Sequence, residues 1–324
     1  MNKKHRVILA IQWIVAIIVL AYIARFVDWR RAATVLSHAD IRWLAVAFML
    51  SLTSPLVLAL RWAGLLDAIG IIYRVLTAYR TYLIGYFYSL AMPGVIGCDA
   101  VRVMLCGRET GAGLALISAT ALAERGLGVV ALLLILSLGG AVSPIAGRGV
   151  VPGFVPLLAL TGVGGVVMVP WLLRRFTFMQ PSSILDRMGF IGRAIRRIGL
   201  ALAPIKNIRV TQLLVALVLS LAAQFIDIPV VYGLSRSIGL HLNITMLLVA
   251  MPIVYLVTFL PISPGGLGLR EGVMVVILAQ FGVPTADAAL LALVIFLNRV
   301  AIGGVGGVQF LFRDAKPTLG ARSG

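Results

Sequence analysis

The chain has 324 residues, of which 61% are hydrophobic and only 12% are charged, and this composition excludes a water-soluble globular core. A mean hydropathy of +1.06, with several apolar stretches of about 18 residues or more, indicates a helical protein that crosses a membrane repeatedly. The net charge of +17 does not indicate nucleic acid, because the basic residues gather between residues 174 and 209 and at both termini. Basic segments beside membrane helices report orientation and contact with anionic lipid. We therefore expect no nucleic-acid partner.

Two spans are predicted at the start of the chain. Residues 7–27 exceed the length of a signal-peptide core and lack an Ala-x-Ala site, so we expect a retained first helix. A polar link leads to a second span at about 41–60, where Pro55 could introduce a kink. The mixed stretch from Arg61 to Arg80 is interpreted as a loop and interfacial segment, with tyrosines suited to the headgroup level.

A re-entrant hairpin is predicted next, at about residues 75–106. Its apolar flanks are shorter than the roughly 20 residues that cross a bilayer, and they meet at the Pro-Gly-Val-Ile-Gly tract beginning at Pro93. Asp99 and Arg102 follow the tip, three residues apart, and could form an ion pair. Irregular backbone at membrane depth survives only where protein buries it or where it lines a wet cavity. The tip is therefore a candidate site.

Two further spans, at about 114–142 and 151–173, lead to the longest polar region. The first of these spans carries Glu124 and Arg125, which are consecutive and point about 100° apart on a helix, so each needs a partner elsewhere. In residues 174–209, apolar side chains recur at spacings of three and four beside arginines. This pattern predicts an amphipathic helix in the headgroup plane that contacts anionic lipid; a solvated cytoplasmic connector is the alternative.

The same order of elements then recurs. A fifth span at about 210–234 carries Asp227 inside apolar sequence. A second re-entrant hairpin is predicted at about 245–281, followed by a sixth span at about 286–312. The remaining tail is polar, and we expect it to be disordered.

Matching motifs in the two halves predict an internal repeat. The second tip begins at Pro261 and contains Pro-Gly-Gly-Leu-Gly, which shares the form Pro-Gly-x-(Ile/Leu)-Gly with the first. A hydrophobic helix follows each tip and carries a buried pair of charged or polar residues. The second residue of this pair is Arg125 in one half and Arg299 in the other. The predicted halves are residues 41–142 and 210–312.

Orientation follows from the basic segments. If residues 174–209 are cytoplasmic, alternation puts both basic termini in the cytoplasm as well. The first hairpin then enters the membrane from the cytoplasm and the second from the opposite side. Such inverted repeats are typical of transporters that bind substrate near the bilayer midplane. We therefore expect one all-α transmembrane domain over residues 1–324, with about six spans and two re-entrant hairpins.

Charged residues inside or against apolar sequence mark the predicted site. On insertion scales each costs about 2.5–3.5 kcal/mol at a helix centre, which favours a functional role. The positive N-terminal end of the second helix of each hairpin would add to the arginines and complete a receptor for a phosphate group. A shared polar cavity is the first interpretation and a purely structural ion network the second. The candidate substrate-binding residues are Asp99, Arg102, Glu124, Arg125, Ser263, Gly265, Gly266, Arg270, Glu271 and Arg299.

The sequence offers little for catalysis. The three histidines lie in polar ends or loops, and the two cysteines, Cys98 and Cys106, have no metal-ligand spacing. The Gly-Gly-Val-Gly-Gly tract at 303–307 lacks the Lys-Ser/Thr of a phosphate loop, and close helix packing is its expected use. We expect no enzymatic activity, no metal and no cofactor.

Several motifs carry a resemblance to a known family. They are the stretch from Tyr82 to Arg102, Glu124-Arg125, the Ser-Pro-Gly-Gly-x-Gly-x-Arg-Glu motif at 263–271, and Arg299. In these motifs, and over essentially its whole length, the chain resembles the flippase-like transmembrane domain of the lysylphosphatidylglycerol synthetase family. Cys98 departs from the family pattern, which often has Gly-Gly-Asp at the first tip.

In that family the domain is associated with moving aminoacylated phospholipid between leaflets, while a separate soluble domain attaches the amino acid. We expect no such soluble domain here, so lipid aminoacylation is not implied. Relatives of stand-alone length are thought to handle other lipids, including hopanoids and polyprenyl-linked sugars. The resemblance therefore implies a flippase of the bacterial inner membrane that moves an anionic or phosphate-bearing lipid by alternating access.

Two other functions are left open. The first is a non-transporting membrane scaffold that partners a lipid-modifying or glycosyl-transferring enzyme. A membrane-embedded transferase is the second, although no convincing base or nucleophile supports it. The expected partners are a membrane lipid as substrate and anionic lipid at 174–209; a lipid-synthesising enzyme and a second copy of the chain are further candidates.

Overall fold

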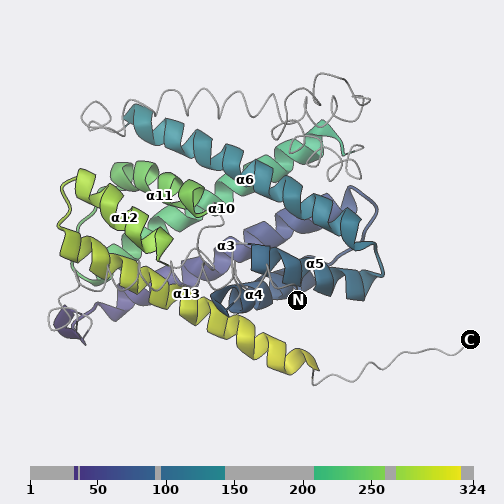
Figure 1. Cartoon of the computed structure of the whole chain (residues 1–324), viewed down its shortest axis with the longest axis horizontal. Helices are drawn as coiled ribbons and strands as arrows, with labels where there is room; N and C mark the ends of the chain where they lie inside the picture. The colour runs from purple at the N-terminus through teal and green to yellow at the C-terminus, as the bar shows by residue number, and fades with distance from the viewer. Residues whose placement is uncertain (1–32, 36, 92–95, 143–207, 260–267, 315–324) are drawn as a thin grey trace, which may run out of the picture.

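The computed structural model describes residues 33–35, 37–91, 96–142, 208–259 and 268–314, and these residues form helices without strands (Figure 1). Four helices are long and apolar enough to span a membrane: α3 (Ile41–Asp67), α6 (Leu114–Val142), α10 (Val210–Ser237) and α13 (Thr285–Asp314). The other four are shorter: α4 (Val75–Ala91), α5 (Ile96–Thr110), α11 (Ile244–Thr258) and α12 (Leu269–Gln280). The chain is therefore a multi-pass helical membrane protein.

Four of the six predicted spans coincide with the long helices. The predicted spans at 7–27 and 151–173 and the amphipathic connector at 174–209 lie outside the described residues, as does most of each hairpin tip. The predicted hairpins coincide with the short pairs α4–α5 and α11–α12. Each of these helices has 17 residues or fewer, below the roughly 20 that cross a bilayer.

The predicted loop from Arg61 to Arg80 is too long, since only residues 68–74 connect α3 and α4. Helix α3 continues past the bilayer-length apolar stretch to Asp67, and Pro55 lies inside it without ending it. Arg61 is only 7% exposed because its guanidinium meets a buried carboxylate from another helix, which the local sequence could not reveal. The connection to α4 is short, and it turns at Gly70, whose φ of 83° favours glycine.

The helices follow the order long, short, short, long twice, and the two sets pack in matching pairs. Within each set the two short helices pack on each other; the first also packs on the preceding long helix and the second on the following one. Between the sets, α4 packs on α13, and α11 packs on α6 in the equivalent way. The first long helices, α3 and α10, run side by side through the centre (Figure 1).

Helices α3 and α10 are antiparallel. At one end, the amide of Asp40, which caps the start of α3, donates to the carbonyl of Ser237, the last residue of α10, over 2.9 Å. At the other end, Leu65 near the end of α3 lies in one packed cluster with Leu213 near the start of α10. Two spanning helices of this arrangement begin on opposite sides of a membrane.

Glycines allow the two sets of helices to cross closely. A Cβ at Gly306 of α13 would lie 1.9 Å from the carbonyl oxygen of Leu83 in α4, and one at Gly139 of α6 would lie 2.7 Å from the carbonyl of Leu248 in α11. These distances leave no room for a side chain, so each crossing requires glycine. The expected packing role of the glycine tract at 303–307 is thereby confirmed.

We predict that Gly306→Ala lowers the free energy of unfolding by about 1–3 kcal/mol, because α13 must move away from the backbone of α4 to admit the methyl group. Gly304→Ala is the matched control on the same helix, since a Cβ there meets nothing within 4 Å. Thermal unfolding of the detergent-solubilised variants measures the difference. Equal stability of the two variants would contradict the close crossing.

Candidate functional site

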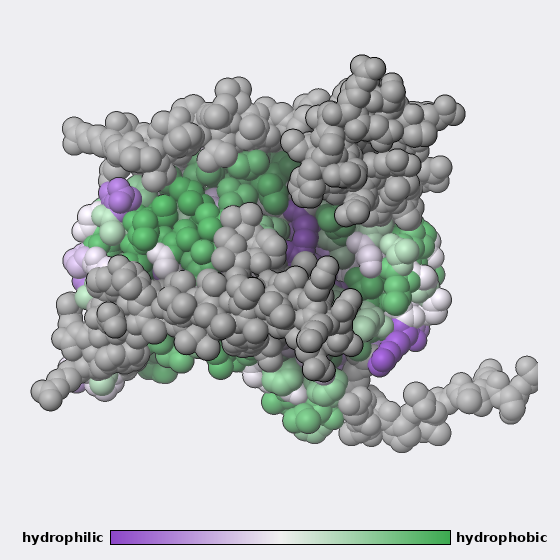
Figure 2. Space-filling model, viewed as in Figure 1, coloured by the Kyte–Doolittle hydropathy of each residue, from purple (hydrophilic) through white to green (hydrophobic). Residues whose placement is uncertain are grey.

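A cavity of about 310 Å³ lies between the two sets of helices, and all eight helices contribute to its lining. It could hold about ten water molecules at roughly 30 Å³ each. Figure 2 shows hydrophilic residues at the bottom of a hollow between apolar surfaces. Five arginines and three carboxylates line the cavity, so positive charge is in excess: Arg61, Arg102, Arg125, Arg270 and Arg299, with Asp99, Glu124 and Asp227.

Glu124 is the centre of a buried network at one end of the cavity. Its carboxylate is 1% exposed and accepts hydrogen bonds from Arg61 Nε at 2.9 Å, Tyr82 Oη at 2.9 Å and Arg102 Nη1 at 3.1 Å. Arg61 also donates through Nη1 to Ser220 Oγ at 2.8 Å. This one carboxylate therefore connects α3, α4, α5 and α6, and Arg61 extends the network to α10.

Asp99 forms the second part of the same network. It accepts from Arg102 Nη2 at 2.5 Å and from Arg125 Nε. The Arg102 guanidinium also stacks on the ring of Tyr82, 3.9 Å from its centroid. The i,i+3 pair that the sequence suggests is present, and Glu124 and Arg125 do find different partners. At this end, each of the three arginines has at least one carboxylate partner.

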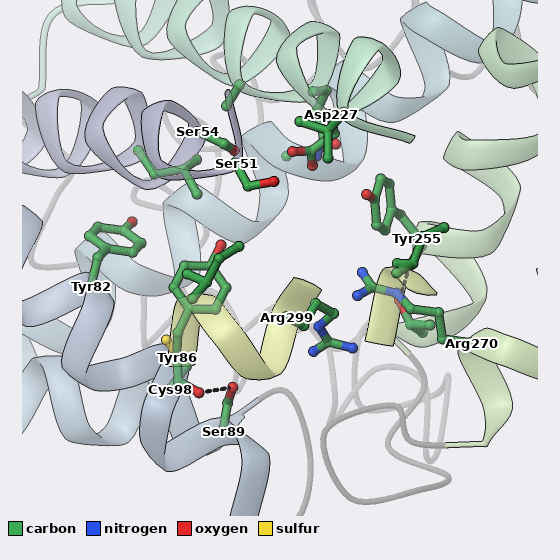
Figure 3. A pocket seen from close by; sticks show the side chains of 18 of the residues that line it. Ser51, Ser54, Tyr82, Tyr86, Ser89, Cys98, Asp227, Tyr255, Arg270 and Arg299 are labelled. Carbon is green, nitrogen blue, oxygen red and sulfur yellow. Dashed lines mark hydrogen bonds between the residues drawn. The ribbon is translucent and has the colours of Figure 1, made fainter. Parts of the chain in front are cut away.

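The opposite end of the cavity is built differently. Arg270 lies with its guanidinium carbon 4.7 Å from the centroid of Tyr255, and Arg299 faces the same space (Figure 3). Among the described residues, no carboxylate comes within ion-pairing distance of either arginine. Arg270 Nε and Arg299 Nη1 are buried and make no hydrogen bond. Asp227 lines this end beside Tyr255, and the Glu271 carboxylate lies near enough to act on Arg299.

Six of the ten predicted site residues line this cavity: Asp99, Arg102, Glu124, Arg125, Arg270 and Arg299. Glu271 is not among the lining residues, since its carboxylate accepts a hydrogen bond from the Gly268 amide at 2.7 Å and caps α12. Ser263, Gly265 and Gly266 lie outside the described residues. The binding of substrate by any of these residues stays a prediction.

Several lining residues were missed as site candidates. Arg61 was assigned to a loop, yet Ser54, Leu58 and Arg61 follow each other at spacings of four and three, which puts them on one helix face. That periodicity, continued beyond the apolar stretch, was the available signal. Tyr82, Tyr86 and Tyr255 were missed because tyrosines are also typical of the headgroup level.

The arrangement is suited to binding an anion. Arginine presents a planar fork of donors that matches phosphate and carboxylate oxygens. In the part of the chain that the structure describes, no group of three or more His, Cys, Asp or Glu side chains could hold a metal ion. The cavity thus offers positive charge and hydroxyl groups.

We predict that Arg61→Met destabilises the protein by about 3–5 kcal/mol, because the buried Glu124 carboxylate loses a charged partner. Arg108→Met, at an exposed position of α5, should change stability by less than about 0.5 kcal/mol. Thermal unfolding in detergent compares the two. If both variants unfold at the same temperature, Glu124 does not depend on Arg61.

Comparison with known proteins agrees with this architecture. The chain is 24% identical over 295 residues to a protein described as UPF0104 membrane protein PH1989 from Pyrococcus horikoshii, covering 83% of this chain and 85% of that protein. No solved structure matches the chain. Residues 8–307 match the family described as the lysylphosphatidylglycerol synthase TM region. The match covers nearly the whole transmembrane part, and the chain belongs to this family.

Proposed function

We propose that this protein is a lipid transporter that moves an anionic or phosphate-bearing lipid between leaflets by alternating access. The observation that carries the proposal is the cavity with five arginines and three carboxylates at the meeting point of all eight described helices. Charges inside a membrane protein are expensive and typically mark a substrate or ion pathway. The family described as a lysylphosphatidylglycerol synthase region is consistent with a lipid as substrate.

The helix order supports a two-sided mechanism. The antiparallel course of α3 and α10, together with the matching packing of the two sets, is what an inverted repeat produces. In our proposal the halves are residues 41–142 and 210–312, and the pairs α4–α5 and α11–α12 are re-entrant hairpins that enter from opposite leaflets. Rocking of one half against the other would open the cavity to each leaflet in turn.

The size of the cavity supports a headgroup rather than a whole lipid. A volume of about 310 Å³ accommodates a phosphate with a small polar substituent. The acyl chains would remain in the bilayer, beside the apolar outer surfaces of the helices. Arg102, Arg125, Arg270 and Arg299 would supply the positive charge for the headgroup, and Asp99 and Glu124 would orient the first two.

We predict that proteoliposomes containing the protein move acyl-labelled anionic phospholipid to the outer leaflet faster than empty liposomes. Arg270→Ala should reduce this rate at least tenfold, because the headgroup loses a cation that forms no ion pair with a described carboxylate. Arg108→Ala, at an exposed position of α5, is the matched control and should retain the rate. A dithionite-quenching assay with phosphatidylglycerol, phosphatidic acid and a polyprenyl phosphate measures all three proteins.

The second candidate is a scaffold for a membrane enzyme that modifies lipids. Its supporting observation is the Glu124 network, in which the carboxylate already accepts hydrogen bonds from three side chains. Such a network could stabilise the fold without binding a substrate. A scaffold would co-purify with its enzyme and would move no lipid in isolation. If lipid movement in proteoliposomes with the wild-type protein is no faster than in empty liposomes for every lipid tested, the transporter is rejected and the scaffold is favoured.

A further inference from the structure

The arginines at the two ends of the cavity differ in whether they form ion pairs, which indicates different roles for the two ends. We propose that a phosphate group binds at the end formed by Arg270 and Arg299. At the end around Glu124 the charges pair with one another, and this end stabilises the fold. The phosphate is either that of a lipid headgroup or a free phosphate ion, because the same oxygens would meet the arginines. Only the choice of a lipid as its source rests on the proposed function.

Ion pairing with carboxylates distinguishes the arginines at the two ends. Arg102 has both terminal nitrogens on carboxylates and leaves only Nε without a partner. Arg270 and Arg299 have no carboxylate partner among the described residues, and each leaves a buried nitrogen without a hydrogen bond. A buried donor without a partner destabilises the folded state, and a charged donor does so more strongly. A ligand that accepts from both guanidinium groups would remove this destabilisation.

The repeated motif shows where the neutralising group is missing. Glu124-Arg125 follows the first tip, and Asn298-Arg299 follows the second. Glu124 binds two arginines, but the amide of Asn298 is neutral and donates to Ser51 Oγ at 2.8 Å. At the position that matches Glu124, the second half therefore has a neutral side chain.

The charges around Arg299 call for an anion of more than one oxygen. The guanidinium groups of Arg270 and Arg299 lie close enough to repel each other (Figure 3). Two carboxylates offset part of this charge, Asp227 on α10 and Glu271 on α12, but neither forms an ion pair with Arg270 or Arg299. A phosphate can accept from two guanidinium groups at once, which a single carbonyl or hydroxyl oxygen cannot do as well. The hydroxyl groups of Tyr86 and Tyr255 also face this end of the cavity.

Thermal unfolding of the full chain in a neutral, phosphate-free detergent tests the assignment. The probes are inorganic phosphate at constant ionic strength against chloride, short-chain phosphatidic acid, and short-chain diacylglycerol as the lipid without phosphate. We expect the melting temperature to rise saturably with a phosphate-bearing probe and not with chloride or diacylglycerol, since a ligand that binds only the folded state stabilises it. Protection by phosphatidic acid alone identifies a lipid source, and equal protection by inorganic phosphate identifies the free ion.

Arg270→Gln and Arg299→Gln should weaken this protection at least tenfold in apparent affinity, while Arg108→Gln retains it. Without ligand, Arg299→Gln should unfold no earlier than the wild type, because it removes a buried charge without a described ion-pair partner. This second readout distinguishes a lost site from a misfolded protein. Absence of protection by either phosphate probe, or full protection in both arginine variants, would overturn the assignment.

The result is independent of transport. If the wild type moves lipid but both variants keep full phosphate protection, the transporter stands and the assigned subsite falls. Phosphate protection that depends on Arg299, in a protein that moves no lipid, supports the subsite and rejects the transporter.

Discussion

The need to neutralise buried charge at membrane depth organises this structure. Glu124 is almost fully buried, and its carboxylate accepts hydrogen bonds from Arg61, Tyr82 and Arg102, which belong to three other helices. Those partners fix where α3, α4 and α5 stand against α6. A membrane offers little hydrophobic force between helices, so such polar contacts and the close glycine crossings hold them in register.

The cavity is a consequence of that arrangement. Because the two sets of helices pack in matching pairs, equivalent charged segments from both converge on one space. Their partners are not equivalent, however: the first set contributes carboxylates beside its arginines, whereas Asn298 takes the place of a carboxylate in the second. The helices of the two sets are arranged alike, but the charges at the two ends of the cavity differ. This difference would orient a bound headgroup.

Sequence reasoning predicted the four long described helices well, because apolar length acts locally. Its failure at Arg61 has a physical cause. A charged residue in the sequence indicates the end of a span unless its partner is known. The partner of Arg61 is Glu124, which is 63 residues away in the sequence. Glu271 makes a local hydrogen bond with the Gly268 amide, which sequence reasoning did not anticipate; its role in binding stays a prediction. The periodicity of the sequence does not reveal which residues pair when they lie far apart in the chain.

We propose that two broken segments enter from opposite leaflets and bring their arginines to one cavity. An experimental structure of the full chain in lipid nanodiscs measures this directly. We expect the tips before Ile96 and Leu269 to approach from opposite sides of the bilayer, with Arg125 and Arg299 facing a common polar space. Tips that enter from the same leaflet, or arginines that point into the lipid, would contradict the account.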